Sequence, residues 1–371
     1  MRRRRLRLRT ALLALAAVYA AWLAAQAVGY KRYVSAPVEA SSSPAPPFPV
    51  ELLGAYHMHT KFSDGRKTVE AVAEVARRAG LDFIILTDHG SPNEPSLAAQ
   101  GRKDGLLVLA GTEISSSRGH LVALAFEPPP RPFAQNAALA AREVRALGGF
   151  TIIAHPFSKT RWSWGGEDVY NGLEIMDSDS MLRRHWPRAL IRLPLLFFKH
   201  EAVFLKIVAR PEDQIRMWDR MLEEGMALGF FSVDAHWLYR PAFALFRLHV
   251  LLEESPAADF AAARTQIFEA LRHGRFFSAV DAAADPAGFR FWLDGQTLRV
   301  RAPYSFAHEA RLIHGGRAVA VSMESEFAHP AAGPGAYRVE VYLRERSPLD
   351  GDVPWIISNP VIVPAGGKES R

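Results

Sequence analysis

The sequence predicts an α/β protein with barrel-like closure, preceded by a membrane-spanning helix and followed by a small β module. From about residue 50, short apolar runs alternate with helical segments, which favours a parallel sheet that is either open or closed into a barrel. Polar motifs follow most of these runs, and barrel enzymes carry catalytic side chains at such strand ends, so the barrel is preferred. After about residue 285 the pattern changes to short alternating strands with Gly- and Pro-containing turns, which predicts a β-sandwich-like module over 285–371.

Residues 1–33 are predicted to form an N-terminal membrane anchor. No charged residue occurs between Thr10 and Tyr30, and about 20 apolar residues are enough to cross a bilayer. Six arginines precede this stretch and only Lys31 and Arg32 follow it, which favours a catalytic domain outside the cytoplasm, either periplasmic or extracellular. The alternative is a cleaved secretion signal, because Ala25-Gln26-Ala27 resembles a small-residue cleavage site.

The composition of the remaining chain limits its partners and its chemistry. Residues 34–49 are rich in Ser, Pro and Ala, which predicts a semi-stiff linker that holds the domain off the membrane. The net charge is +6, but eight positive charges precede residue 33, so the rest of the chain carries −2. This balance gives no reason to expect a nucleic-acid partner. The absence of cysteine excludes thiolate ligands and a cysteine nucleophile.

The predicted strands and helices place one domain in residues 50–284. Its strands are expected over 52–59, 81–86, 106–110, 120–126, 150–154, 173–176 and 226–233. Its helices are expected over 69–79, 137–147 and 211–224. In the C-terminal module, strands are expected over 289–293, 297–301, 310–313, 318–322 and 338–343, with 355–363 closing the set. This module contains no metal or nucleophile motif.

Imidazoles and carboxylates gather at the predicted strand ends. The candidate metal ligands are His57, His59, Asp64, His89, Glu113, His120, His155, Asp234 and His236. Alternating residues of a strand share a face, so His57 and His59 can bind one ion, and Asp234 and His236 repeat this spacing. Nitrogen and carboxylate ligands without thiolates suit two or three divalent ions of Zn, Mn or Fe. Such ions lower the pKa of a bound water to about 7 and so create a hydroxide nucleophile.

Individual positions also have ordinary structural explanations. Asp64 precedes Gly65, and Asp-Gly is a common turn pair. His155 follows an apolar strand and is equally suited to a hydrogen-bonded core position. In the adjacent pair Asp88-His89, one side chain is expected to face the metals while Asp88 orients a ligand or caps the turn.

The ordered series of motifs resembles the polymerase-and-histidinol-phosphatase (PHP) superfamily. The series is His57-x-His59, Asp64, Thr87-Asp88-His89, Glu113, His120, His155-Pro156 and Asp234-x-His236. The resemblance covers about residues 50–282 and implies a distorted (β/α)7 barrel with a trinuclear metal centre that hydrolyses phosphoesters.

The resemblance also implies a distribution of the ligands over three ions. The first ion would be held by His57, His59, Glu113 and Asp234. Glu113 would bridge to a second ion held by His120 and His155, and a third would be held by Asp64, His89 and His236. His155, His236 and His89 are the candidates for help in proton transfer.

The C-terminal module, ending in residues 354–360, is similar to what accompanies CehA/McbA-type metallohydrolases of this superfamily. Because some of those cleave carbamate or carboxylic esters, the resemblance leaves the scissile bond open. The predicted function is therefore a metal-dependent phosphoesterase acting on a small-molecule ester, with carboxylic or carbamate ester hydrolysis, or an inert metal-binding protein, as alternatives.

Two groups of basic residues bear on the substrate. Lys159, Arg161, Arg183 and Arg184 follow predicted strand ends and are either phosphate-binding groups or solvated surface charges. Residues 183–210 combine basic, aromatic and aliphatic side chains, with Pro187 and Pro194 excluding a second membrane span. This segment is expected to lie on the membrane, to roof the site against a lipid-like substrate, or to form an ordinary buried lid.

Overall fold

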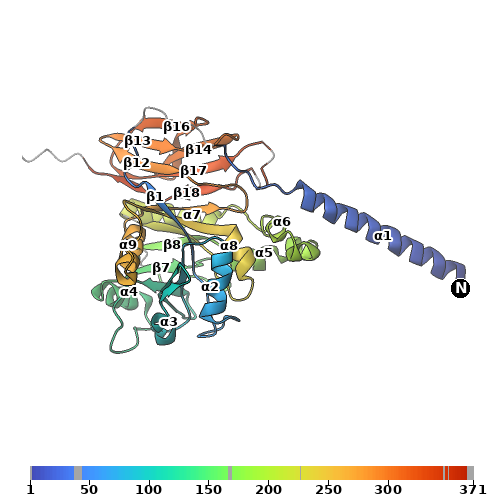
Figure 1. Cartoon of the computed structure of the whole chain (residues 1–371). Helices are drawn as coiled ribbons and strands as arrows, with labels where there is room; N and C mark the ends of the chain where they lie inside the picture. The colour runs from blue at the N-terminus through green and yellow to red at the C-terminus, as the bar shows by residue number, and fades with distance from the viewer. Residues whose placement is uncertain are drawn as a thin grey trace, which may run out of the picture.

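A computed structural model describes residues 2–36, 44–165, 169–225, 227–345, 347–349 and 351–365. Most of the Ser- and Pro-rich part of the predicted linker, residues 37–43, and the first residue of the predicted strand 226–233 lie outside these ranges. The chain forms an α/β body with a β-rich C-terminal part on one side and a projecting N-terminal helix (Figure 1). The α/β class is confirmed.

The first sheet begins with a parallel core. Strands β1 (Val50–Tyr56), β2 (Phe83–Leu86) and β4 (Leu106–Ala110) are parallel, with β3 (Gly101–Lys103) antiparallel at the edge. All four residues of β2 are fully buried, as expected of an apolar run covered on both faces. On its other side β1 pairs antiparallel with β10 (Phe246–Leu252), which pairs with β11 (Phe276–Val280). β10 and β11 were not predicted from the sequence.

The second sheet contains strands β5 to β9. These are β5 (Thr112–Ile114), β6 (His120–Leu124), β7 (Phe150–Ala154), β8 (Gly172–Asp177) and β9 (Leu228–Ser232). β7, β8 and β9 are parallel, whereas β6 is antiparallel to both of its neighbours. A uniformly parallel arrangement is therefore wrong at β6. The connection from β5 to β6 is a few residues long, far too short for the crossover that parallel strands require.

The two sheets meet at two places. Gly111 links β4 directly to β5, and a Cβ at this position would lie 2.3 Å from the carbonyl oxygen of Ala123, so only glycine fits. At the other margin, the Val233 amide donates to the Tyr56 carbonyl at 3.0 Å, and the His59 amide donates to the Ala235 carbonyl at 3.0 Å. The ends of β1 and β9 are therefore held side by side.

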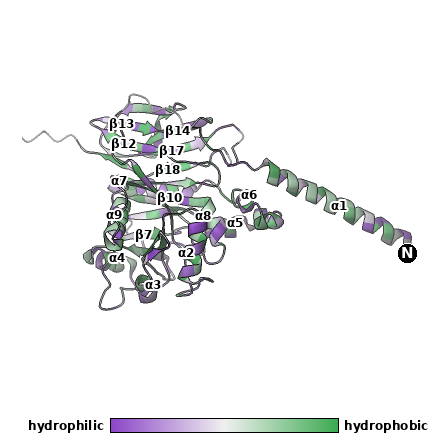
Figure 2. Ribbon diagram, in the orientation of Figure 1, coloured by the Kyte–Doolittle hydropathy of each residue, from purple (hydrophilic) through white to green (hydrophobic). Residues whose placement is uncertain are grey.

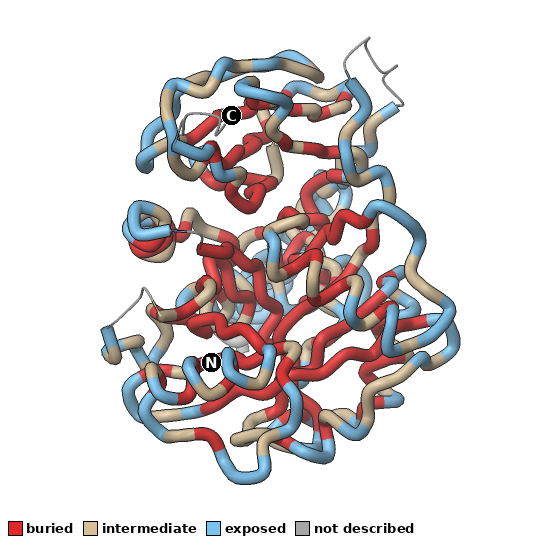
Figure 3. Tube along the Cα trace, turned by 90° about the vertical axis from the view of Figure 1, so that its left-hand side faces the viewer, coloured by how far each residue is buried: buried red, intermediate tan, exposed pale blue. Residues whose placement is uncertain are grey.

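The helices cover the strands and begin at residues that can cap them. The main ones are α2 (Val69–Arg78), α3 (Glu94–Ala98), α4 (Ala137–Ala146), α7 (Glu212–Glu224), α8 (Tyr239–Leu245) and α9 (Phe260–Arg272). The side chains of Thr68, Asn136 and Asp259 accept hydrogen bonds from the first turns of α2, α4 and α9. In Figure 3 the buried residues concentrate in the strands that these helices enclose.

The C-terminal part contributes strands to two sheets, one of which is continuous with the first sheet of the body. Strands β12 (Arg290–Asp294), β13 (Thr297–Arg301) and β16 (Glu326–Pro330) form a separate sheet. The others are β14 (His308–His314), β15 (Arg317–Ser322), β17 (Gly335–Leu343), β18 (Ile356–Ser358) and β19 (Val361–Val363). β18 pairs with both β17 and β11, so hydrogen bonding crosses the expected boundary at residue 285.

Helix α1 (Arg2–Gly29) is long and apolar enough over Leu6–Gly29 to cross a membrane or to be a signal sequence (Figure 2). The residues after it, up to 36, lie against the C-terminal side of the body rather than forming a free spacer. The Tyr30 hydroxyl donates to the Ala282 carbonyl at 2.7 Å, and the Tyr33 amide donates to the Ala283 carbonyl at 3.1 Å. The described start of the predicted linker, Val34–Ala36, therefore does not hold the body away from α1.

A short helical segment connects β8 to α7 and lies beside the end of α1. It consists of α5 (Ser178–Leu190), the 3₁₀ helix η2 (Leu193–Phe197) and α6 (His200–Phe204). The Tyr19 hydroxyl of α1 donates to the Ile191 carbonyl at 3.0 Å, which fixes this proximity. Figure 1 shows α5 and α6 on the side of the body from which α1 projects.

Candidate metal centre

The predicted ligand residues converge at one edge of the two sheets. His57 and His59 follow β1, His89 follows β2, His155 follows β7, and Asp234 and His236 follow β9, whereas Glu113 lies within β5. His120 is the first residue of β6, but because β6 is antiparallel its start meets the ends of its neighbours. His120 accordingly pairs with Ala154, directly before His155. The reversed strand explains how a residue at a strand start joins a cluster of strand ends.

A first set of ligand atoms has the spacing of a metal site. His57 Nε2 lies 3.2 Å from His59 Nε2 and 3.5 Å from Asp234 Oδ1. His59 Nε2 lies 3.3 Å from the same Asp234 oxygen. Tetrahedral coordination with metal–ligand bonds of about 2.0–2.1 Å places ligand atoms about 3.3–3.4 Å apart. The observed separations of 3.2 to 3.5 Å fit a single ion.

Glu113 lies at the centre of the cluster, and its two carboxylate oxygens face different partners. Oε2 lies 3.2 Å from His57 Nε2 and 3.2 Å from His59 Nε2. Oε1 lies 2.7 Å from His120 Nδ1 and 3.1 Å from His155 Nε2. The carboxylate therefore faces two neighbouring sets of nitrogen atoms, as a bridging ligand must.

A third set lies at the more open side of the cluster. Asp64 Oδ2 is 3.3 Å from His236 Nε2 and 3.6 Å from His89 Nε2, and Asp64 Oδ1 is 3.5 Å from His59 Nδ1. The Asp64 side chain is 54% exposed, whereas the side chain of His59 is fully buried. The nine predicted residues thus lie together, with Asp64 at the rim.

Asp88 lies beneath this rim and organises the loop that carries Asp64. Its carboxylate accepts hydrogen bonds from the Thr60 amide at 2.6 Å, the Thr60 hydroxyl at 2.8 Å, the Ser63 hydroxyl at 2.7 Å and the Ser96 hydroxyl at 3.0 Å. These four hydrogen bonds show that Asp88 caps the turn, which is one of the two roles predicted for it.

Glu174 on β8 was not identified from the sequence, although it contacts two of the candidate ligands. Glu174 Oε1 lies 2.6 Å from His57 Nδ1, and Oε2 accepts a hydrogen bond from the His155 amide at 2.8 Å. A carboxylate on the second ring nitrogen fixes the orientation of a ligand histidine and increases its basicity. The available signal was a charged residue within the apolar run predicted as strand 173–176, which lies fully buried in β8.

Three of the candidate ligands adopt a strained backbone conformation. His57, His155 and Asp234 have φ values of 68°, 27° and 42°, in the left-handed region that non-glycine residues rarely occupy. Each lies just after a strand, where this conformation turns the chain at the sheet edge. Strained residues of this kind cost about 1–3 kcal/mol each and cluster at functional sites.

The charges in the cluster strongly perturb its titration. Burial by itself lowers the pKa of His59, but hydrogen bonds with Asp234 and Glu113 outweigh it and raise the pKa to about 9. For His155, burial is likewise outweighed, chiefly by Glu113, and the pKa rises to about 10. Burial would raise the pKa of Glu113, yet the surrounding histidines hold it well below its usual value. The carboxylates therefore favour positive charge on His59 and His155, whereas burial outweighs them at His89 and lowers its pKa.

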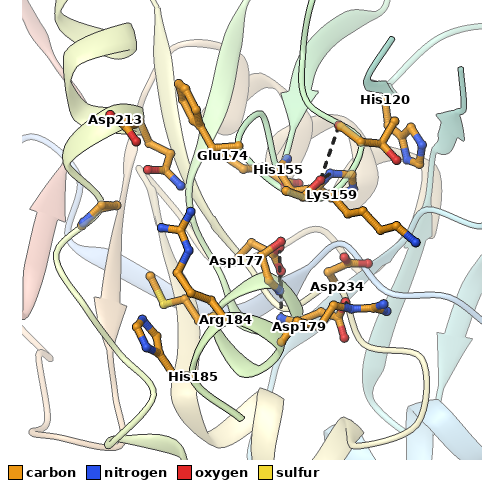
Figure 4. Close-up of a pocket in the computed structure, with 18 of the residues that line it drawn as sticks. His120, His155, Lys159, Glu174, Asp177, Asp179, Arg184, His185, Asp213 and Asp234 are labelled. Atoms are coloured by element: carbon orange, nitrogen blue, oxygen red, sulfur yellow. Dashed lines mark hydrogen bonds and ion pairs between the residues drawn. The ribbon is translucent and has the colours of Figure 1, made fainter. Parts of the chain in front are cut away.

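A cavity of about 780 Å³ opens over the cluster. Figure 4 shows Asp234, His155 and His120 on one side of it, with Arg184, His185 and Asp213 on the other. Its basic lining residues are Lys159, Arg183, Arg184 and Arg210. Arg161 does not line it, and its guanidinium lies 5.7 Å from the centre of the Phe157 ring.

Two of the acidic residues that line this cavity lie at the start of α5. Asp177 caps α5 by accepting hydrogen bonds from the amides of Asp179 and Ser180, and it also lines the cavity. Burial, reinforced by the charge of Asp234, raises the pKa of Asp177 to about 7. Asp179 is paired with Arg183.

Comparisons with known proteins identify the domain. Residues 55–144 match the family model of the PHP domain, a stretch that contains six of the nine predicted ligands. An uncharacterized protein of Methanocaldococcus jannaschii is 24% identical over 115 residues, which are 28% of this chain and 66% of that protein. The chain thus spans just under two thirds of the length of this curated relative.

Two solved structures resemble the chain at low identity. A two-domain protein of Bacteroides vulgatus, described as containing a PHP-like metal-dependent phosphoesterase, is 15% identical, with a TM-score of 0.45. The similarity covers 90% of this chain and 99% of that one. A metal-dependent phosphoesterase of Bifidobacterium adolescentis is also 15% identical, with a TM-score of 0.32 over 49% of this chain and 87% of that one. The family-model match over residues 55–144, together with the clusters of His, Asp and Glu side chains, supports a PHP-type metal-dependent hydrolase domain in this chain.

Proposed function

We propose that this protein is a phosphoesterase with two or three divalent ions of Zn, Mn or Fe, held by the nine residues predicted from the sequence. The single observation that carries the proposal is one cavity lined both by residues of the ligand cluster and by basic side chains. Phosphoryl transfer needs electrostatic stabilisation of the phosphate oxygens, and this cavity offers positive charge from two directions. The strands around it are proposed to form the distorted (β/α)7 barrel, with residues 285–371 as an appended β-sandwich module.

The proposed assignment of ligands follows the contacts between side chains. His57, His59, Asp234 and Glu113 would hold the first ion. Glu113 would also contribute to the second, with His120 and His155. Asp64, His89 and His236 would hold the third.

Bound ions would act as Lewis acids toward the ester and would activate a water as nucleophile. The Glu174 carboxylate orients the His57 ring and accepts a hydrogen bond from the His155 amide. It therefore positions two proposed ligands without touching substrate. The Tyr239 hydroxyl lies 2.7 Å from the His59 carbonyl and 2.8 Å from that of His236, which ties the loops after β1 and β9 together. His155, His89 and His236 are proposed to assist proton transfer at the rim of the cluster.

Two cations are best placed to bind the phosphate. Arg183 is paired with Asp179, and Arg210 lies 2.7 Å from Glu212, so their charges are partly neutralised. Among the described residues, no carboxylate forms an ion pair with Lys159 or Arg184, and both line the cavity. We assign phosphate binding to Lys159 and Arg184.

The test is a panel of substrates with the metal-loaded protein. Phosphomonoesters, phosphodiesters and carboxylic esters are compared in the natural chain and in the double variant Lys159→Ala/Arg184→Ala. The double variant is expected to raise KM for phosphoesters by about a hundredfold or more, since each of the two charge-assisted hydrogen bonds contributes about 1.5–3 kcal/mol. Arg161→Ala, a neighbouring cation outside the cavity, serves as the matched control and is expected to leave KM unchanged.

The other outcomes of this panel are equally informative. Turnover of carboxylic or carbamate esters alone, insensitive to the double variant, would contradict the proposal and favour the ester hydrolases that resemble the CehA/McbA branch. Silence across the whole panel in a fully metal-loaded protein would favour an inert metal-binding protein.

We further propose that α1 is an uncleaved anchor and that the body lies outside the cytoplasm. The contacts of Tyr19, Trp22 and Tyr30 with the body support retention, since cleavage after Ala27 would remove the first two. The mass of the mature protein and the accessibility of the body to added protease in intact cells would test both statements. A mature chain beginning near residue 28 would contradict the anchor.

A further inference from the structure

An exposed apolar surface lies beside the N-terminal helix. It is formed by Trp186, Leu190, Ile191, Leu193, Phe197 and Phe198, here called the apolar rim, whose exposed fractions range from 48% to 87%. A buried lid was one expectation for this segment, and these exposures exclude that role for the rim residues. Contiguous exposed apolar side chains of this kind mark a surface that binds a partner or a membrane.

The position of the rim along α1 indicates whether the rim binds a protein partner or a membrane. The Tyr19 hydroxyl donates to the Ile191 carbonyl at 3.0 Å, and the Arg192 guanidinium lies 5.0 Å from the centre of the Trp22 ring. Tyr19 lies ten residues before the end of α1, which is about 15 Å along a helix axis. The candidate membrane span of α1, Leu6–Gly29, is about 36 Å long, only about 6 Å more than the hydrocarbon core. Wherever α1 is set in a bilayer, Tyr19 and the adjoining rim therefore reach its apolar region.

The body is held at this depth by direct contacts. Tyr30 and Tyr33, immediately after α1, donate hydrogen bonds to the carbonyls of Ala282 and Ala283. The Lys199 ammonium lies 5.7 Å from the centre of the Tyr30 ring. These contacts join the end of α1 to both the body and the segment that carries the rim.

The charge of the rim suits lipid headgroups. Five basic residues and no acidic residue occur between Asp179 and Glu201, namely Arg183, Arg184, Arg188, Arg192 and Lys199. Aromatic and aliphatic side chains interleaved with Arg and Lys are typical of segments that lie in the membrane interface. Juxtamembrane basic residues also attract anionic lipids. A bilayer is thus the occupant that both the geometry and the charge favour.

The same segment connects the rim to the cavity. The first half of α5 lines the cavity with Met181, Arg183 and Arg184. The helix then kinks at His185, where φ is −113° and ψ is 21°, just before Pro187. Seven residues separate Arg184 from Ile191, about 10 Å along a helix. A phosphate at headgroup depth is therefore within reach of the cavity while its apolar chain stays at the rim.

We infer that the apolar rim lies in the membrane interface and that the substrate is a phosphoester carried by a membrane amphiphile. This inference rests on the proposed phosphoesterase function for its substrate, but not for the position of the rim. In the reaction, water breaks one P–O bond of the ester, with its hydroxyl going to phosphorus and its proton to the alcohol oxygen. The alcohol stays in the bilayer, and phosphate is released to the solvent.

The position of the rim can be measured without any activity. The natural chain has no cysteine, so Phe197→Cys can be labelled at one site with an environment-sensitive fluorophore. The full chain is reconstituted into phosphatidylcholine–phosphatidylglycerol vesicles and exposed to nitroxide-labelled lipid or to aqueous iodide. The label at 197 is expected to be quenched by the lipid and protected from iodide. Leu139→Cys on α4, which is 51% exposed and lies away from α1, is the matched control and is expected to show the reverse.

Two results would overturn the membrane position. Equal quenching by iodide at residues 197 and 139 would place the rim in water. Protection of residue 197 from both quenchers would indicate that a protein, such as a second copy of this chain, covers the rim.

The substrate class is tested with the metal-loaded chain in the same vesicles. Hydrolysis of phosphatidic acid in the bilayer is compared with hydrolysis of p-nitrophenyl phosphate in solution. Phe197→Asp is expected to slow the bilayer reaction by about tenfold or more, because a charge in the interface opposes insertion, and to change the soluble reaction by less than about twofold. Leu139→Asp should change neither.

The failures of the two proposals are distinguishable. Hydrolysis of the soluble ester but not of phosphatidic acid would contradict the lipid substrate while supporting the phosphoesterase. Inactivity on both esters would contradict the phosphoesterase and with it the substrate, whereas lipid quenching at residue 197 would still establish the membrane position.

Discussion

In the described part of the chain, two buried groups of histidines and carboxylates can be compared, and one of them resembles a metal site. The structural cluster consists of Glu51, His249, Asp281 and Arg290. His249 Nδ1 lies 2.8 Å from Glu51, and Nε2 lies 3.0 Å from Asp281. Arg290 pairs with Glu51 at 2.5 Å, and the His249 ring stacks on Phe277. Each ring nitrogen faces one carboxylate, and an arginine supplies permanent positive charge.

The metal centre differs in where its charges converge. Several nitrogen atoms approach one carboxylate, as at Glu113, and among the described residues no Arg or Lys pairs with Glu113 or Asp234. The site also opens onto a cavity, and His249 does not line that cavity. The content of His and acidic residues therefore does not by itself indicate a metal site. Donor atoms that converge without a balancing cation do indicate one.

The largest contrast is expected from the same substitution in both clusters. Asp234→Asn removes a carboxylate that lies 3.3 Å from His59 Nε2, so the first ion should bind poorly. We expect metal content to fall and kcat/KM to drop about a thousandfold or more, since bound ions supply several kcal/mol of transition-state stabilisation. Elemental analysis and turnover of a phosphoester would measure both.

Asp281→Asn is the matched control. It leaves His249, Arg247 and Arg32 without their buried partner, so the melting temperature should fall. The metal content of the folded protein should not change. An Asp234→Asn protein with full metal and full turnover, or an Asp281→Asn protein without metal, would remove the distinction between the clusters.

The structural cluster also predicts a pH dependence of stability. Burial by itself lowers the pKa of His249, but Asp281 and Glu51 outweigh it and raise the pKa to about 9. A raised pKa contributes stability that is complete below the unfolded value of about 6.5 and is lost as the pH rises through 9. The loss is on the order of 3 kcal/mol. The pKa of Glu51 is lowered to about 2, so its own contribution persists across this range.

Thermal unfolding of the metal-saturated protein between pH 6.5 and 9 would measure this loss. In that state the ligand histidines carry ions rather than protons, which isolates His249. His249→Gln is expected to flatten the profile. Parallel profiles for the natural chain and the variant would show that His249 does not carry the effect.

The second contrast concerns how much of each cluster the sequence predicts. The candidate ligands could be found because most of them follow apolar runs that are easily recognised as strands. Two such runs, 106–110 and 150–154, are strands with the same bounds in the structure. His249 lies within β10, which was not predicted, and its partners come from distant segments that only the antiparallel pairing with β1 and β11 brings together. Long-range pairing of this kind leaves no local pattern.

The positions of His120 and Glu174 also depend on pairing between strands that are distant in sequence. His120 was identified as a ligand from its place in the motif series, but its position required the reversal of β6, which a short loop dictates. Glu174 was missed because a single charge in an apolar run has the same pattern as an ordinary buried strand. In both cases the neighbour across the sheet, rather than the neighbour in sequence, determines the role.

Glu174 therefore offers the next test, smaller in effect. Glu174→Gln keeps the volume but removes the charge that lies 2.6 Å from His57 Nδ1. Loss of such an outer partner costs about 10- to 100-fold in metal affinity. Competition with a chelator would measure this affinity, and KM at saturating metal should change less than about twofold because Glu174 acts through His57. Unchanged metal affinity would indicate that Glu174, like Glu51, stabilises the fold rather than the metal centre.

The smallest effect is expected at Asp64, which tests whether the metal centre itself has two parts. Its side chain is 54% exposed and its oxygens lie 3.3 to 3.6 Å from His236, His89 and His59, so water can replace it as a ligand. Asp64→Ala should remove about one ion per chain and lower kcat/KM by about tenfold or less, and excess metal should restore much of the rate. Titration of metal per protein alongside turnover would measure both quantities. If Asp64→Ala abolishes activity as completely as Asp234→Asn, the exposed third set belongs to the reacting core, and burial would not distinguish essential ligands from accessory ones.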